Sequence, residues 1–95
     1  MVNGVIDERE KEVIIEVAKK YNASAVYLFG SSLVRDDYND IDLAVEGVKP
    51  EEFFKFYGEL LMRIPRPIDL VDLSKEDEFN KLILEKGVKI YGRFV

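Results

Sequence analysis

The chain has no cysteine and no histidine, and these two absences exclude several kinds of active site. Zinc sites depend mainly on cysteine and histidine ligands, while thiol nucleophiles and serine-histidine-aspartate catalysis need the same side chains. Glutamine, threonine and tryptophan are missing as well. Any acid–base or metal chemistry in this protein must therefore use carboxylates, lysine, arginine or tyrosine.

Positive charge is also scarce. The 95 residues include 14 lysines and arginines against 19 aspartates and glutamates, which gives a formal net charge of -5. Such a surface does not attract the backbone of nucleic acids or an anionic membrane, so we expect neither as a direct partner. Because the sequence has no apolar run of transmembrane length and no signal-peptide pattern, a cytoplasmic protein is expected. The length predicts a single domain over residues 1–95.

Two short apolar runs with a polar segment between them form the most informative part of the sequence. The first, residues 25–29, predicts a buried strand that ends at Gly30 and Ser31. The second strand is predicted over residues 40–46, where Asp40 and Asp42 alternate with apolar residues. Alternate side chains of a strand share a face, so these carboxylates should lie side by side, with their backbones about 6.5 to 7 Å apart.

Neighbouring carboxylates repel each other, and packing alone gives no reason for this arrangement. A hard divalent cation removes the repulsion. Mg²⁺ is the best match, because it binds few protein carboxylates and is completed by water and substrate phosphates. A glycine-serine turn offers N–H groups and a hydroxyl to such phosphates. Each feature alone is common in ordinary turns, but their combination favours a metal and phosphate site.

Around this stretch, the sequence pattern predicts an α/β (α+β) fold in which helices flank a small mixed sheet. Asp7 and Glu10 form a capping box that begins a helix over about residues 8–21, and Asn22 can end it. A short helix or turn is expected over residues 31–36, followed by a loop.

Pro50 begins another predicted helix, which Pro65 and Pro67 end. Its packed face has apolar residues at helical spacing: Phe53, Phe56, Tyr57, Leu60, Leu61 and Ile64. Phe54 lies off that face and is a candidate contact with a partner, although single exposed aromatic residues are ordinary.

The third strand, predicted over residues 68–73, contains two more carboxylates. Asp69 lies between apolar neighbours, where an ionised side chain is costly without a counter-charge. Asp72 takes the opposite face and borders a helix N-terminus, where acidic residues are common for structural reasons. We therefore prefer Asp69 as a third functional carboxylate, with Asp72 as the alternative.

A last helix and a short strand complete the predicted fold. Ser74 and Asp77 are expected to cap the helix, whose apolar side consists of Phe79, Leu82 and Ile83. Lys86 and Gly87 should end it, and residues 88–91 can add a strand.

The string FGSSLVRDDYNDIDLAV, residues 29–45, resembles the signature of the DNA polymerase beta-type nucleotidyltransferases, in particular the minimal nucleotidyltransferase (MNT) domains. The resemblance implies that Gly30 and Ser31 bind the triphosphate, with Arg35 as a weaker candidate for neutralising its charge. The spacer between Gly-Ser and Asp-x-Asp, Ser32 to Asn39, has eight residues and is shorter than is usual in the family. This departure bears more on Arg35 than on the aspartates.

The same resemblance implies that Asp40, Asp42 and Asp69 are catalytic and bind metal, two Mg²⁺ ions in all. It implies transfer of a nucleoside monophosphate, AMP from ATP, to a hydroxyl acceptor, with Asp69 able to accept the acceptor's proton. MNT proteins of this kind resemble the antitoxins of HEPN/MNT pairs, so the expected acceptor is a tyrosine of a small helical HEPN-type partner. Two alternatives stay open: neutralisation of the partner by binding without catalysis, and transfer to a small molecule. The base, the acceptor and self-association into an oligomer are also left open.

Overall fold

The computed structural model describes residues 6–29 and 40–92. The elements follow the order α1 (Glu8–Lys20), β1 (Ala25–Leu28), β2 (Ile41–Glu46), α2 (Pro50–Arg63), β3 (Ile68–Asp72), α3 (Glu78–Lys86) and β4 (Val88–Gly92). This order confirms the predicted α/β (α+β) fold, and the bounds differ from those expected by one residue in most cases. The short helix or turn expected at 31–36 lies outside the described residues.

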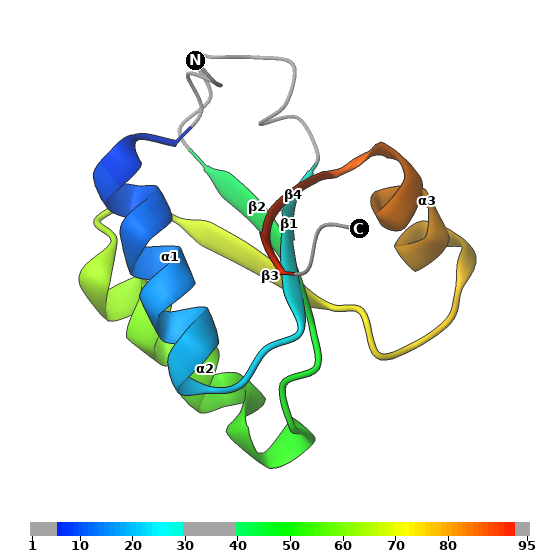
Figure 1. The fold of residues 1–95 in the computed structure, drawn as a ribbon, viewed down its shortest axis with the longest axis horizontal. Coiled ribbons are helices and arrows are strands. Elements are labelled where there is room, and N and C mark those ends of the chain that lie inside the picture. The colour runs from blue at the N-terminus through cyan, green and yellow to red at the C-terminus, as the bar shows by residue number, and fades with distance from the viewer. Residues whose placement is uncertain (1–5, 30–39, 93–95) are drawn as a thin grey trace.

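The four strands form one mixed sheet in the order β3-β2-β1-β4. β1 is antiparallel to both β2 and β4, whereas β2 and β3 are parallel and are connected through α2. A parallel pair needs a crossover of this kind, because a tight turn cannot join two strands that run the same way. Helices α1 and α2 lie together on one face of the sheet and α3 lies on the other (Figure 1).

Local signals at the ends of α1 agree with the sequence. The Asp7 carboxylate accepts the Glu10 N–H at 2.8 Å, and the Glu10 carboxylate accepts the Asp7 N–H at 3.1 Å, so the predicted capping box is present. Asn22 has a φ of 59°, the left-handed conformation in which asparagine often follows a helix. The chain can then turn back toward β1.

The main core lies between the sheet and the α1–α2 pair. Successive strand residues alternate between faces, and the side chains of Ile41 and Leu43 point into this core with no exposed surface. Phe56 and Leu60 of α2 are equally buried against them. The apolar stripe of α2 is narrower than predicted, because Leu61 is 45% exposed.

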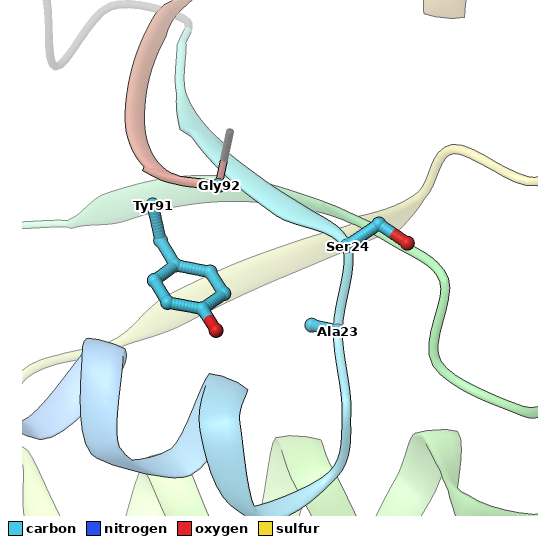
Figure 2. Close-up of a pocket in the computed structure, with 4 residues that line it drawn as sticks. All are labelled: Ala23, Ser24, Tyr91 and Gly92. Carbon is cyan, nitrogen blue, oxygen red and sulfur yellow. The ribbon is translucent and has the colours of Figure 1, made fainter. Parts of the chain in front are cut away.

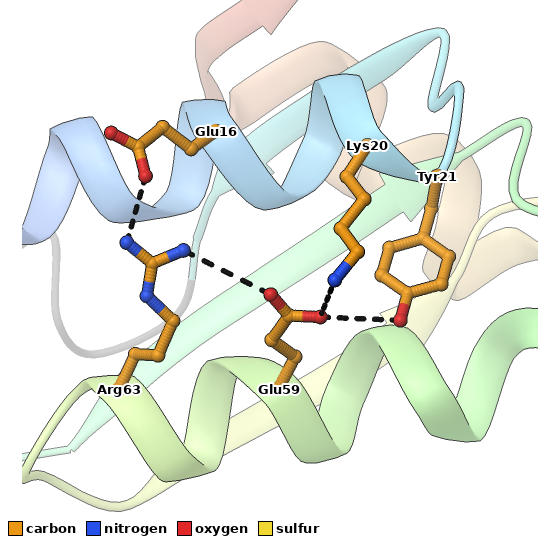
Figure 3. Close-up of polar contacts among 5 residues, drawn as sticks. All are labelled: Glu16, Lys20, Tyr21, Glu59 and Arg63. Atoms are coloured by element: carbon orange, nitrogen blue, oxygen red, sulfur yellow. Dashed lines mark hydrogen bonds and ion pairs between the residues drawn. The ribbon is translucent and has the colours of Figure 1, made fainter.

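A polar network joins α1 and α2 above this core (Figure 3). Glu59 accepts hydrogen bonds from Lys20 Nζ at 2.9 Å and from the Tyr21 hydroxyl at 3.2 Å. Arg63 spans the two helices, with ion pairs to Glu16 at 2.7 Å and to Glu59 at 3.9 Å. These contacts hold the two helices in a fixed relation on the outer side of the core.

The opposite face of the sheet has a smaller core, where Ile83 of α3 packs against Ala44 and Leu73. Asp77 alone caps α3 with its side chain, by accepting the Asn80 N–H at 2.8 Å, so the expected contribution of Ser74 was wrong. Phe79 and Leu82 were also expected to pack inward but are about half exposed, and the buried residues of α3 are Asn80 and Ile83.

None of the helices in the described part of the chain is both long and apolar enough to cross a membrane.

Candidate functional site

The carboxylates singled out in the sequence lie where β1 ends and where β2 and β3 begin. Beyond the last residue of β1, the Phe29 N–H still donates to the Asp42 carbonyl at 3.0 Å, so the two strands stay paired up to this point. Ile41 and Leu43 point into the main core, which directs Asp42 to the face of the sheet that carries α3. Asp40 and Asp42 are both half-buried.

The third carboxylate comes from β3. In the parallel pairing of β2 with β3, Asp42 is the register partner of Asp69, so the two side chains stand next to each other on the same face of the sheet. Asp69 is exposed. The expectation that it would be embedded among apolar side chains was therefore wrong: β3 is an outer strand, and this face of it is open at its first residues.

Electrostatics follow from this arrangement. The pKa of the Asp42 carboxyl is raised above its usual value, first by burial and then by the negative charges of Asp69 and Asp40. A hydrogen bond with Asp69, which favours the protonated form of Asp42, acts in the same direction. Among the described residues no lysine or arginine forms an ion pair with any of the three. The group is thus a concentration of negative charge that a cation would stabilise.

Asp72 lies elsewhere. It is the register partner of Val45, at the far end of β3, and its carboxylate accepts the Ser74 N–H at 2.9 Å. This is the geometry of a turn in which an aspartate binds the backbone two residues further on. Asp72 thus has a local structural partner, whereas Asp69 stands beside Asp42. The functional role of Asp69 stays a prediction.

The donor set suits Mg²⁺, although it is small. Across residues 6–29 and 40–92, no group of three acidic side chains is close enough to enclose a metal ion. Mg²⁺ does not need such a cage, because one or two carboxylates together with substrate phosphates and water complete its octahedral shell. Asp42, with Asp40 and Asp69 near it and with no ion pair to a lysine or arginine of the described residues, meets that requirement. Gly30, Ser31 and Arg35, the expected triphosphate ligands, lie outside the described residues.

Two of the hollows formed by described residues are at the other end of the sheet, and a third, of about 160 Å³, lies between the first turn of α1 and the end of α2. The first, of about 510 Å³, is lined by Ala23, Ser24, Tyr91 and Gly92 (Figure 2). The second, of about 560 Å³, lies next to it, since Ser24 lines both. In the β1–β2 pairing this end is that of Glu46, four residues along β2 from Asp42. These two hollows are therefore separate from the carboxylates.

A comparison with protein families identifies the fold. The family model described as "Polymerase beta, Nucleotidyltransferase" matches residues 12–94. The chain belongs to this nucleotidyltransferase family. No match was found among curated proteins. The resemblance stated from the residue string 29–45 is thereby confirmed, and with it nucleotidyltransferase activity.

Solved structures show the same minimal nucleotidyltransferase fold. An MntA–HepT toxin–antitoxin structure has a TM-score of 0.69 and 22% identity, over 92% of this chain and 74% of the other. The structure of a tri-AMPylated HEPN toxin of Shewanella oneidensis in complex with an MNT antitoxin has a TM-score of 0.71 and 23% identity, over 93% of this chain and 74% of the other. A toxin–antitoxin structure with AMP-PNP has a TM-score of 0.68 and 23% identity, over 87% of this chain and 73% of the other. Identity this low establishes likeness of fold.

Proposed function

We propose that this nucleotidyltransferase transfers AMP from MgATP to a tyrosine hydroxyl of a HEPN-type partner protein and acts as its antitoxin. The observation that supports this most directly is the register of β2 and β3, which sets Asp42 beside Asp69 with Asp40 nearby. Among the described residues no ion pair offsets the charge of these three carboxylates, and their mutual repulsion favours a bound cation.

Each carboxylate has a role that its exposure suits. Asp40 and Asp42, both half-buried, would hold Mg²⁺, which when bound neutralises the charge of the triphosphate and of the transferring group. Asp69 is exposed and so can be reached by a hydroxyl that arrives from solvent. It would accept the proton as the hydroxyl oxygen bonds to the α-phosphorus, the bond from that phosphorus to the leaving oxygen breaks, and pyrophosphate departs.

Gly30, Ser31 and Arg35 are assigned to the triphosphate on the resemblance alone. A glycine-serine turn after a strand offers backbone N–H groups to phosphate oxygens, and an arginine can bind two such oxygens at once. These roles complete the proposal: Gly30 and Ser31 would hold the leaving pyrophosphate, while the aspartates of β2 and β3 act at the α-phosphate.

The acceptor is assigned to a protein for two reasons. The net charge of -5 disfavours a nucleic acid, and the two larger hollows formed by described residues lie away from the carboxylates, which supports an acceptor that brings its own complementary surface. Among proteins of the same fold, the HEPN toxin of Shewanella oneidensis carries AMP groups in its complex with an MNT antitoxin. Another MntA–HepT structure carries two aspartate-to-glutamate substitutions two residues apart, the spacing of Asp40 and Asp42.

Intact-mass spectrometry tests this proposal. A HEPN-type partner incubated with this protein and MgATP should gain one or more AMP groups, and peptide mapping should place them on tyrosine. Asp42→Asn, Asp69→Asn and removal of Mg²⁺ with a chelator should each abolish the gain, while Asp72→Asn should leave it unchanged. If transfer required Asp72 but not Asp69, the third functional carboxylate would be Asp72 instead of Asp69.

Complex formation without transfer is the alternative. An unmodified partner whose ribonuclease activity is nonetheless inhibited by this protein would favour neutralisation by binding. Modification of a small hydroxyl compound but of no partner protein would instead favour a metabolite as the acceptor.

A further inference from the structure

The hydroxyl group of Tyr57 on α2 donates a hydrogen bond to the backbone carbonyl of Ile68, with 2.5 Å between the two oxygens. Ile68 is the first residue of β3 and directly precedes Asp69. The helical periodicity predicts for Tyr57 only a place on the packed face of α2. The residue type indicates a further role: this position has a tyrosine and not a phenylalanine, and a buried tyrosine hydroxyl usually has a hydrogen-bond partner.

The position of this bond on β3 is specific. β3 is an outer strand of the sheet that the described residues form, so within this sheet only its side facing β2 is paired with another strand. On that side the Pro67 carbonyl accepts the Ile41 N–H at 3.0 Å. Successive carbonyls of a strand point in opposite directions, so the Ile68 carbonyl points to the open side. The Tyr57 hydroxyl therefore holds the open side of β3 at the residue before Asp69.

A second contact holds the segment that leads into β3. Arg66 Nη1 donates to Glu10 Oε1 at 2.8 Å, and both side chains are less than a fifth exposed. This ion pair connects the turn after α2 to the first turn of α1. The Tyr57 bond acts closer to Asp69 and can be removed without loss of the aromatic ring, so it is the one that can be tested cleanly.

We propose that Tyr57 is a positioning residue for Asp69: by fixing the Ile68 carbonyl, its hydroxyl keeps the Asp69 carboxylate beside Asp42 while transfer takes place. This inference rests on the proposed function. Displacement of a catalytic group by about 1 Å can lower a rate about 100-fold. Loss of one of several contacts displaces Asp69 less, so Tyr57→Phe should lower kcat by about tenfold. The KM for ATP should stay within about twofold of the wild-type value, because an interaction that is made only in the transition state affects kcat and not substrate binding.

Tyr21→Phe is the matched control. The Tyr21 hydroxyl also crosses between secondary-structure elements, from the end of α1 to Glu59 at 3.2 Å, but its partner belongs to α2 and not to β3 (Figure 3). Two measurements are needed for each variant. One is pyrophosphate release from MgATP in the presence of a HEPN-type partner, analysed for kcat and KM. The other is amide hydrogen exchange at Asp69 and Val71, whose N–H groups face β2 in the parallel pairing, so that it reports on β3 directly.

The expected result is faster exchange at Asp69 and lower kcat in Tyr57→Phe, with both quantities unchanged in Tyr21→Phe. Equal losses of kcat in both variants would indicate a general effect on stability and would overturn the positioning role. Unchanged exchange in Tyr57→Phe would overturn it whatever the transfer assay gives. A wild-type protein that transfers nothing would instead refute the proposed function, and an Asp69→Asn variant with full activity would refute the role of Asp69 on which this inference depends.

Discussion

Asp42→Asn should make the protein more stable while it removes the proposed function. Asparagine has nearly the shape of aspartate but carries no charge, so the substitution removes the ionised group whose burial, and then whose repulsion by Asp69 and Asp40, raises the pKa of the Asp42 carboxyl. Neighbouring strands lie about 4.8 Å apart, and like charges directly opposite each other in a sheet cost about 0.2 to 1 kcal/mol. Burial and the charge of Asp40 disfavour the ionised form of Asp42, as the charge of Asp69 does, so we take the upper half of this energy range. We expect a gain of about 0.5 to 1 kcal/mol at pH 7, or about 2 to 8 °C in Tm.

The pH dependence of this gain has a definite sign. With a raised pKa, the folded protein binds more protons than the unfolded chain between the ordinary value of 3.8 and the raised value. The contribution of Asp42 to stability is therefore complete below the ordinary value and is lost as the pH rises through the raised value. Asparagine does not titrate. The variant should exceed wild type by the full amount at pH 7, and the difference should shrink as the pH falls toward 3.8.

Thermal and urea denaturation of both proteins from acidic to neutral pH would measure this difference. Asp72→Asn is the control, because the Asp72 carboxylate has a favourable partner in the Ser74 N–H and its loss should not stabilise the protein. MgATP should then raise the Tm of wild type but not that of Asp42→Asn, because a ligand stabilises only the protein that binds it. An Asp42→Asn variant less stable than wild type at pH 7 would refute the electrostatic reasoning.

Three further substitutions test the parts of the fold that support the site, each by urea denaturation. Glu10→Ala removes the hydrogen bond from the Asp7 N–H that completes the capping box of α1, and also an ion-pair partner of Arg66. It should lower the free energy of unfolding by about 1 to 3 kcal/mol, and an effect under about 0.5 kcal/mol would contradict this. Phe56→Ala should cost about 3 to 5 kcal/mol because its ring is fully buried, while Phe54→Ala, 78% exposed, should change little. Gly47→Ala should lower the free energy of unfolding by about 1 to 3 kcal/mol, because the φ of Gly47 is 96° and the new β-carbon would lie 2.4 Å from the Ser24 Oγ. Unchanged stability would contradict this and show that the turn adapts.

Local signals made much of the fold predictable. The capping box at Asp7, the helix end at Asn22 and the apolar strands are each specified within a few residues, and the structure has them where the sequence indicates. The alternation of Asp42 with Ile41 and Leu43 likewise follows from strand geometry.

Long-range features could not be read in the same way. The partnership of Asp42 with Asp69 depends on the register of two parallel strands separated by α2, which no local pattern encodes. Exposure of Leu61 depends on how much of α2 the sheet covers, and the hydroxyl bond of Tyr57 depends on where β3 begins relative to that helix. The roles of Gly30 and Ser31 stay predictions that only the family resemblance supports.

The apolar face of β2 explains how a fold can keep adjacent carboxylates in place. Full burial of a side chain such as Ile41 or Leu43 contributes about 1.5 to 3 kcal/mol, and both have no exposed surface. Repulsion between Asp42 and Asp69 costs about 0.2 to 1 kcal/mol, which is less than this burial contributes. The apolar face therefore determines the register, and the register places the two carboxylates side by side. A shift of one residue would turn Asp42 into the main core and expose its apolar neighbours, at a far higher cost. The negative charge is thus held at a fixed place by forces from the other side of the sheet, so Asp42→Asn can remove the charge without altering the strand that presents it.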